Sequence, residues 1–329
     1  MVAPLSSEGR ILEVIHKLPL LESIHFDFEQ PGAPGGSNSP FPIVHGLSNL
    51  KSIVLTRPQA RCIPNGRERQ PWNLVPDGIH SLLASSPLLE NLSISGVVRP
   101  MDFSDIVKEL PDQPRFEACI KSLQLRDMTL SPSPATLQYL YNLQCLDISN
   151  VADEGIWNGL RFFGTRLKVI KISQVTNEVV KYILDYQGLE EFYLTARCRG
   201  SKPYPDRRRL LESALPNHRN SLYAFGVRLH CTHHKENIDL AKLWCLDEDQ
   251  IACLRTLPRL NKLEVTFLSD RMGSGALISL VRNFGSSSLF LFLMPCSSRM
   301  MAWARSSACP IKSGQSTLTP SSCPVARMP

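Results

Sequence analysis

The sequence predicts an α/β solenoid, in which short parallel strands line one side of a stack of repeats and short helices cover the other. Three observations predict it. An apolar triplet recurs nine times along the 329 residues, the central copies are almost evenly spaced, and one proline-containing phrase precedes the triplet in three distant units. Self-similarity at a nearly fixed period is typical of a chain in which each unit packs only on its neighbours.

Each triplet consists of a Leu or Ile, two variable residues, an apolar residue, one variable residue and a second apolar residue. The nine copies are Leu21, Ile24 and Phe26; Leu50, Ile53 and Leu55; Leu89, Leu92 and Ile94; Ile120, Leu123 and Leu125; Leu143, Leu146 and Ile148; Leu167, Ile170 and Ile172; Leu189, Phe192 and Leu194; Leu222, Phe225 and Val227; and Leu260, Leu263 and Val265. Their first residues lie 29, 39, 31, 23, 24, 22, 33 and 38 positions apart. The three central intervals have the 20 to 29 residue period of leucine-rich repeats, and the outer units carry insertions.

The triplets set the strands and the concave face. Side chains alternate along a strand, so the apolar residues point into the core and the variable residues point the other way. We therefore predict a leucine-rich-repeat solenoid shaped as a horseshoe, with about nine irregular repeats and parallel strands on its concave face. Leu146, Ile170 and Phe192 should be buried. The position that usually holds Asn after each strand instead holds other residues, among them Met128 and Val175, so apolar packing should hold these turns.

Helices are predicted before several strands. Residues 153–164 and 176–186 have apolar residues at three- and four-residue spacing, with an N-terminal Asp or Thr and a Gly near the end. Pro19, Pro87 and Pro258 each stand two residues before a triplet, where proline ends a helix and begins extended chain. Insertions at 31–40, 57–77, 97–116, 198–206 and 230–248 nearly all follow a strand, so we expect them on one rim.

The repeat domain is predicted to span residues 1–285. Beyond it, residues 286–329 contain no Asp or Glu, and the expected next strand is replaced by SSSLFLFLMP, whose variable positions are all apolar. We predict that this segment is a disordered or aberrant tail, produced by a frame shift or a retained intron, in which the tenth strand is missing. The basic charge belongs to this end of the chain: the six Arg and Lys residues after Asp270 account for the whole net charge of +6.

Composition favours a soluble, reduced protein. Apolar residues make up 43% of the chain, the ten cysteines form no CxxC pair, and the longest purely apolar run is six residues, against about 20 for a membrane span. The first residues lack the pattern of a secretory signal. These observations predict a cytoplasmic or nuclear location.

No catalytic, cofactor or metal site is predicted. The chain contains no GxxxxGK[ST], HExxH or GxSxG motif. His230, Cys231, His233 and His234, with Cys245 and Cys253 downstream, have ligand chemistry, but their spacing matches no familiar zinc site. Arg207 to Arg209 precede an apolar segment and are interpreted as the solvated first turn of a helix. We therefore expect a non-enzymatic protein without cofactor.

The triplets and the PxLxxL phrases, over roughly residues 11–285, resemble the leucine-rich-repeat portion of fungal F-box-type proteins. This resemblance implies substrate recognition for a ubiquitin ligase. In that family an F-box before the repeats docks the ligase adaptor. Residues 17–22 are superficially similar to the start of an F-box, but they already fit the first triplet, and the 17 residues before Leu18 leave no room for a helical module. An adaptor partner is therefore expected only if an F-box exists outside this chain.

The variable strand positions predict what the concave face binds. Their acids are Glu22, Asp27, Glu90, Asp147, Glu190, Glu191 and Glu264, and their bases are Lys51, Lys121, Arg126, Lys168, Lys171, Arg228 and Lys262. Seven interleaved charges of each sign favour a protein partner over nucleic acid. The predicted contact residues lie in the most regular units: Lys121, Gln124, Arg126, Asp147, Lys168, Lys171, Glu190, Glu191 and Tyr193. Two alternatives stay open, namely binding of nucleic acid or an acidic partner through the basic tail, and a truncated product without function.

Overall fold

A computed structural model describes residues 21–27, 48–56, 76–95, 101–108, 120–126, 128–148, 154–197, 207–230, 248–268 and 288–294. Its main sheet has ten strands: β1 (Ser23–Asp27), β2 (Ser52–Thr56), β3 (Asn91–Ile94), β5 (Ser122–Leu125), β7 (Cys145–Ile148), β8 (Val169–Ile172), β9 (Glu191–Arg197), β10 (Ala224–His230), β11 (Lys262–Leu268) and β12 (Ser288–Met294).

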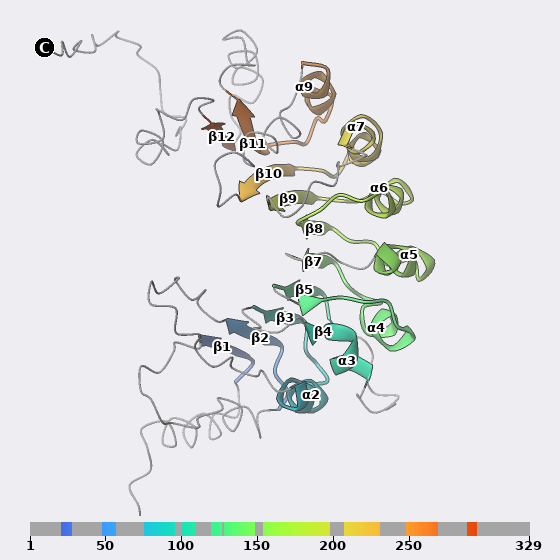
Figure 1. The fold of residues 1–329 in the computed structure, drawn as a ribbon, viewed down its shortest axis with the longest axis vertical. Coiled ribbons are helices and arrows are strands. Elements are labelled where there is room, and N and C mark those ends of the chain that lie inside the picture. The colour runs from blue at the N-terminus through green and yellow to red at the C-terminus, as the bar shows by residue number, and fades with distance from the viewer. Residues whose placement is uncertain are drawn as a thin grey trace, which may run out of the picture.

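The sheet is parallel throughout, and its strands stand in chain order. Each of the nine triplets forms a strand at the predicted place. Equivalent residues pair across the sheet, as in Leu123 with Leu146 and Ile170 with Phe192. In Figure 1 the chain forms an arc, with the strands along its inner side and the helices along its outer side.

The prediction that a tenth strand is missing is wrong. β12 pairs in parallel with β11 and keeps the repeat register, with Leu289 opposite Leu263 and Leu291 opposite Val265. An apolar run without alternation is typical of parallel strands, and any residue except proline supplies the backbone groups of the ladder. Residues 295–329 lie outside the described residues, and the domain boundary at residue 285 stays a prediction.

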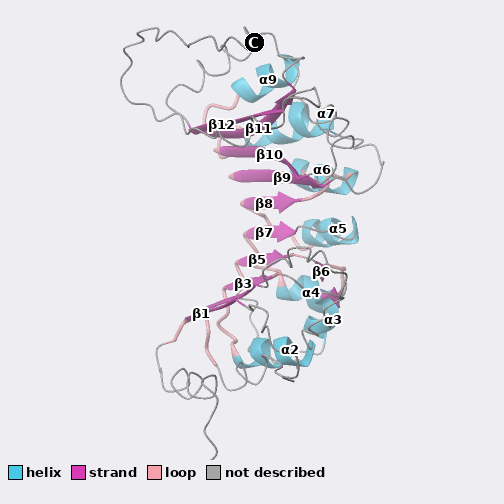
Figure 2. Ribbon diagram, turned by 60° about the vertical axis from the view of Figure 1, so that its left-hand side comes forward, coloured by secondary structure: helices cyan, strands magenta, loops and turns pink. Residues whose placement is uncertain are grey.

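The helices lie on one side of the sheet, as Figure 2 shows in cyan. They are α2 (Pro76–Ser85), α3 (Phe103–Lys108), α4 (Pro134–Tyr139), α5 (Glu154–Phe162), α6 (Asn177–Leu184), α7 (Arg207–Arg209), η2 (Leu210–Ala214), η3 (Leu215–His218) and α9 (Glu248–Arg255). The two helices expected from the sequence are confirmed as α5 and α6. Thr176 caps α6, since its side chain accepts a hydrogen bond from the Val179 N–H. Gly164, just after α5, has φ +69°, a conformation that favours glycine.

One insertion contains more structure than the sequence indicated. Within residues 97–116 the chain forms β4 (Met101–Asp102) and α3, and β4 pairs in parallel with β6 (Met128–Thr129) as a second small sheet. Two backbone N–H groups, of Ser104 and Ser131, donate to the Asp102 carboxylate and tie this turn together. The segment therefore belongs to the helical layer rather than to an open loop.

The core lies between strands and helices and consists of the triplet residues and the inner helix faces. Leu146, Ile170 and Phe192 are fully buried, as predicted. Met128 and Val175, at the position that usually holds Asn, are also buried, which confirms apolar packing at these two turns. Every helix in the described part of the chain is too short or too polar to cross a membrane.

Candidate functional site

The candidate site is the inner face of the sheet, where the variable side chains stand in rows. We call central row the residues between the two core positions of each strand, because the pairing places them side by side: His25, Val54, Ser93, Gln124, Asp147, Lys171, Tyr193, Gly226 and Glu264. We call start row the residues just before each strand, whose backbone N–H groups each donate to the carbonyl of the previous member: Glu22, Lys51, Glu90, Lys121, Gln144, Lys168, Glu190, Tyr223 and Asn261.

Charges in the start row pair with one another. The Lys51 ammonium lies 2.6 Å from Glu22, that of Lys121 lies 2.8 Å from Glu90, and that of Lys168 lies 3.4 Å from Glu190. All six side chains are more than a third exposed, so water screens each pair and the pairs add little to stability. The row therefore offers alternating charges that are already balanced within the chain.

The central row contains a chain of hydrogen bonds across three strands. The Ser93 hydroxyl donates to Gln124 Oε1 at 2.8 Å, and Gln124 Nε2 donates to Asp147 Oδ2 at 3.0 Å. Burial raises the pKa of Asp147, while Arg126, Lys171 and the Gln124 amide act in the opposite direction. Side chains linked in this way have few alternative rotamers, so the row presents a fixed pattern of polar groups.

The row continues into a cluster centred on Tyr193. The ammonium groups of Lys171 and Lys262 lie 5.7 and 5.3 Å from the centroid of its ring, within the range of cation–π attraction. Tyr193 is only 8% exposed, and its buried hydroxyl has no hydrogen-bond partner among the described residues. An interface anchor needs an accessible ring, so a partner would reach Tyr193 only after the two lysines move.

Gly226 makes room for this ring on β10. A Cβ at Gly226 would lie 2.5 Å from Tyr193 Cδ1, closer than real Cβ contacts allow. The absence of a side chain there lets the ring lie across the strand and lets Lys262 approach from β11. Glycine serves here through close packing rather than through an unusual φ.

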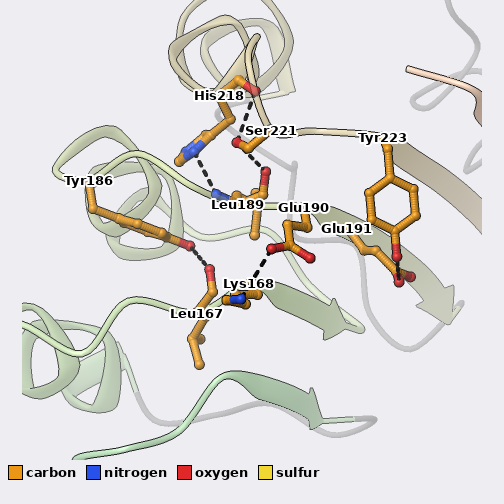
Figure 3. Close-up of polar contacts among 9 residues, drawn as sticks. All are labelled: Leu167, Lys168, Tyr186, Leu189, Glu190, Glu191, His218, Ser221 and Tyr223. Atoms are coloured by element: carbon orange, nitrogen blue, oxygen red, sulfur yellow. Dashed lines mark hydrogen bonds and ion pairs between the residues drawn. The ribbon is translucent and has the colours of Figure 1, made fainter. Parts of the chain in front are cut away.

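A second aromatic residue of the cluster, Tyr223, belongs to the start row. The Tyr223 hydroxyl donates to the Glu191 carboxylate, as Figure 3 shows, and this contact raises the pKa of Tyr223 to about 12. The pKa of the Lys262 ammonium is raised, mainly by the neighbouring Tyr193 phenol and to a smaller extent by the Glu191 carboxylate. The cluster therefore joins carboxylates, ammonium groups and two phenols across four adjacent strands, β8 to β11.

Side chains from the following unit anchor the start of three of the triplets. In each case the backbone N–H of the triplet's first Leu is the donor. Leu50 donates to the Ser86 hydroxyl, Leu167 to the Tyr182 hydroxyl and Leu189 to His218 Nδ1. Figure 3 shows the last of these, with Tyr186 donating to the Leu167 carbonyl. Different residue types thus satisfy one recurring backbone group, and adjacent units are locked in register.

The structure places the nine predicted contact residues in different settings. Gln124, Asp147, Lys171 and Tyr193 adjoin in the central row, with Arg126 close enough to act on Asp147 and Glu191 beside Tyr223. Lys121, Lys168 and Glu190 stand in the start row, where acids or bases of the chain already pair with them.

The residues that the prediction left out are Ser93, Tyr223, Gly226, Lys262 and Glu264. They lie in the less regular units. Only the register across strands shows that Ser93, Gly226 and Glu264 belong to the central row and that Tyr223 and Lys262 lie beside it. Whether this face binds a partner stays a prediction.

The other sequence candidates are placed as follows. Arg208 pairs with Glu212, and Arg209 donates to Asn177, so both arginines contact their own chain. Among the described residues, no group of three or more His, Cys, Asp or Glu side chains could hold a metal ion. Residues 231–247, which contain most of the His and Cys cluster, lie outside the described residues, as do residues 1–20 with the F-box-like phrase.

Comparisons with known proteins are sparse. No protein-family model and no curated protein sequence matches the chain. Three solved chains match it, among them an internalin (inlF) from Listeria monocytogenes. That structure shares 16% identity with this chain, the match covers 66% of this chain and 70% of the internalin chain, and the TM-score is 0.29. At this identity and TM-score, the likeness assigns neither function nor partner to this chain.

Proposed function

We propose that this protein is a leucine-rich-repeat solenoid of about nine or ten units, shaped as a horseshoe, and that its concave face recognises another protein without catalysis. The observation that carries the proposal is the central row. Nine in-register strands present polar, charged and aromatic side chains side by side, and a parallel sheet fixes their spacing.

The order of these side chains supports a protein partner. Hydrogen bonds hold Ser93, Gln124 and Asp147 in place before any partner arrives, which lowers the entropy lost on binding. Side chains of both charge signs surround Tyr193 in space, whereas a nucleic-acid surface would carry one sign. The Tyr193 hydroxyl has no hydrogen-bond partner among the described residues, so it can gain one when the covering lysines move to a partner's carboxylates.

Lysine footprinting tests this proposal with a built-in control. The chain is used to capture partners, and each captured protein is purified and titrated back while lysine acetylation is followed by mass spectrometry. Bound partner should protect Lys171 and Lys262 on the concave face and leave Lys181 on α6 reactive. Equal protection of Lys181, or unchanged reactivity of Lys171 and Lys262, would contradict a concave site.

Substitution provides the second arm. Tyr193→Ala, Arg126→Ala and Lys171→Ala together should weaken the purified complex by at least about tenfold, since truncating interface aromatic and arginine residues commonly costs more than 1 kcal/mol. The matched control is Lys181→Ala with Arg208→Ala, which removes two cations from the helical side. An equal loss in both variants would indicate general destabilisation.

The resemblance to F-box-type proteins extends the proposal to substrate recognition for a ubiquitin ligase. In that case, the captured partner should become ubiquitinated and be degraded faster when this chain is expressed. If expression of the chain or of the triple variant leaves the partner's lifetime unchanged, the chain recognises that partner without a role in its turnover.

A further inference from the structure

A second surface lies outside the central and start rows, at the C-terminal ends of helices α4 and α5. Phe162 is 84% exposed, Tyr141 57% and Phe163 38%, and they are three of the four large apolar side chains exposed in the described part of the chain. Isolated exposed aromatic residues are common, but a group of them marks an interaction surface. We call these three residues the aromatic ledge.

The ledge draws its residues from two neighbouring units. The rings of Phe162 and Phe163 meet edge to face with centroids 5.5 Å apart. The Thr165 hydroxyl, two residues after Phe163, donates to the carbonyl of Tyr141 at 3.5 Å, which fixes the α4 turn against the α5 turn. Three exposed aromatic side chains therefore lie on two turns that a hydrogen bond joins.

A hollow of about 380 Å³ is lined by Arg166, which follows Phe163 by three residues, and by Leu184, Asp185, Tyr186, Gln187 and Asn217. Several of its polar groups are already engaged. Asp185 pairs with Arg161 of α5, the Asn217 amide donates to the carbonyls of Leu184 and Tyr186, and the Tyr186 hydroxyl donates to Leu167.

Arg166 is the basic side chain that lines the hollow. It is exposed, and it makes no ion pair with any acid among the residues that the structure describes. A guanidinium binds a carboxylate through two parallel hydrogen bonds, so a single arginine can select an acidic side chain. The hollow therefore favours an anion next to an apolar surface.

We propose that the ledge and the hollow together bind an acidic segment of a protein partner, with a carboxylate on Arg166 and a neighbouring large apolar side chain on Phe162 and Phe163. Arginine and aromatic residues are the types enriched at protein interfaces. A single arginine beside the Asp185 carboxylate, without an ion pair to any described residue, favours a peptide over a nucleic acid, which needs a continuous basic track. This surface is separate from the concave site, so neither proposal depends on the other.

Selection from a phage library of random dodecapeptides on the full chain tests the proposal. Enriched peptides should contain Asp or Glu beside a large apolar residue. Synthetic versions, labelled with fluorescein, should bind at least about tenfold more weakly to Arg166→Ala and to Phe162→Ala, a loss typical of interface hot spots. Thermal unfolding of both variants should equal that of the wild type, because both side chains are exposed.

Two controls separate this site from others. Arg208→Ala, which removes an exposed arginine of the helical side, should bind the peptides as the wild type does. The concave variant Lys171→Ala with Tyr193→Ala should also bind them normally, so failure here and failure of the proposed function are distinguishable. The proposal is overturned if no peptide is enriched, if the enriched peptides lack acids, or if neither Arg166→Ala nor Phe162→Ala weakens their binding. It is also overturned if a labelled oligouridylate binds more tightly than they do in an Arg166-dependent manner.

Discussion

Replacing Gly226 with Ala tests how the concave face is packed around Tyr193. The added methyl group would lie 2.5 Å from Tyr193 Cδ1 and 2.9 Å from Cε1, so the ring must turn away from β10. The φ angle of Gly226 lies outside the left-handed region, and the backbone of β10 there is an ordinary strand that alanine can adopt. The conflict is therefore between two side chains alone.

The expected magnitude follows from two opposing contributions. Overpacking of a well-filled site costs about 1 to 3 kcal/mol. Alanine in a strand is favoured over glycine by about 0.5 to 1 kcal/mol, because it has less backbone freedom to lose. Gly226→Ala should therefore lower the free energy of unfolding by up to about 2.5 kcal/mol. In a Tyr193→Ala background the conflict disappears, and the same change should raise it by about 0.5 to 1 kcal/mol.

Urea unfolding followed by circular dichroism measures both effects. The wild type, the two single variants and the double variant form a cycle whose coupling reports the contact between residues 193 and 226. Equal slopes of the unfolding free energy against urea would show that the denatured state is unchanged. A loss of the same size in both backgrounds would refute the proposed packing.

Two further outcomes are expected. Burial lowers the pKa of His218, whose Nδ1 accepts from the Leu189 N–H, so the native state favours the neutral ring. Stability should then decrease as the pH falls from about 7.5 past the unfolded pKa of about 6.5, and urea titrations of His218→Gln should show a flatter profile; parallel profiles would contradict this role. The second outcome concerns β12: a chain ending at residue 294 should unfold at a higher temperature than one ending at residue 287, which exposes the edge of β11, and coincident unfolding would show that β12 adds no stability.

The strand positions were predictable because the repeat pattern is local. Each triplet contains its own period of two, and packing of identical units adds no competing preference, so Leu123, Leu146 and Ile170 were assigned to the core correctly. β12 was missed because an apolar run on both faces has no alternation to detect. The α3 segment was missed because its six residues give too short a helical period.

The candidate site was predicted in part. Alternation along the strands placed Lys171 and Tyr193 on the inner face. No sequence pattern indicated that Gly226 makes room for the tyrosine ring or that Lys262 reaches it. The side chains that anchor strand starts were equally hidden. Ser86, Tyr182 and His218 stand at different distances from the next triplet, so no fixed spacing marks them.

The sequence alone determined which residues form strands, which of them face the core and in what order the units stack, because these properties depend on periods of two residues and on repeats along the chain. Only the tertiary structure decided which side chains meet. Lys171, Tyr193, Gly226 and Glu264 are separated by 22 to 38 residues between successive members, and their contacts depend on the register between strands and on the space that one missing side chain leaves. The same holds for the turns after α4 and α5, which carry the exposed Tyr141 and Phe162 and which the hydrogen bond from Thr165 to the Tyr141 carbonyl joins.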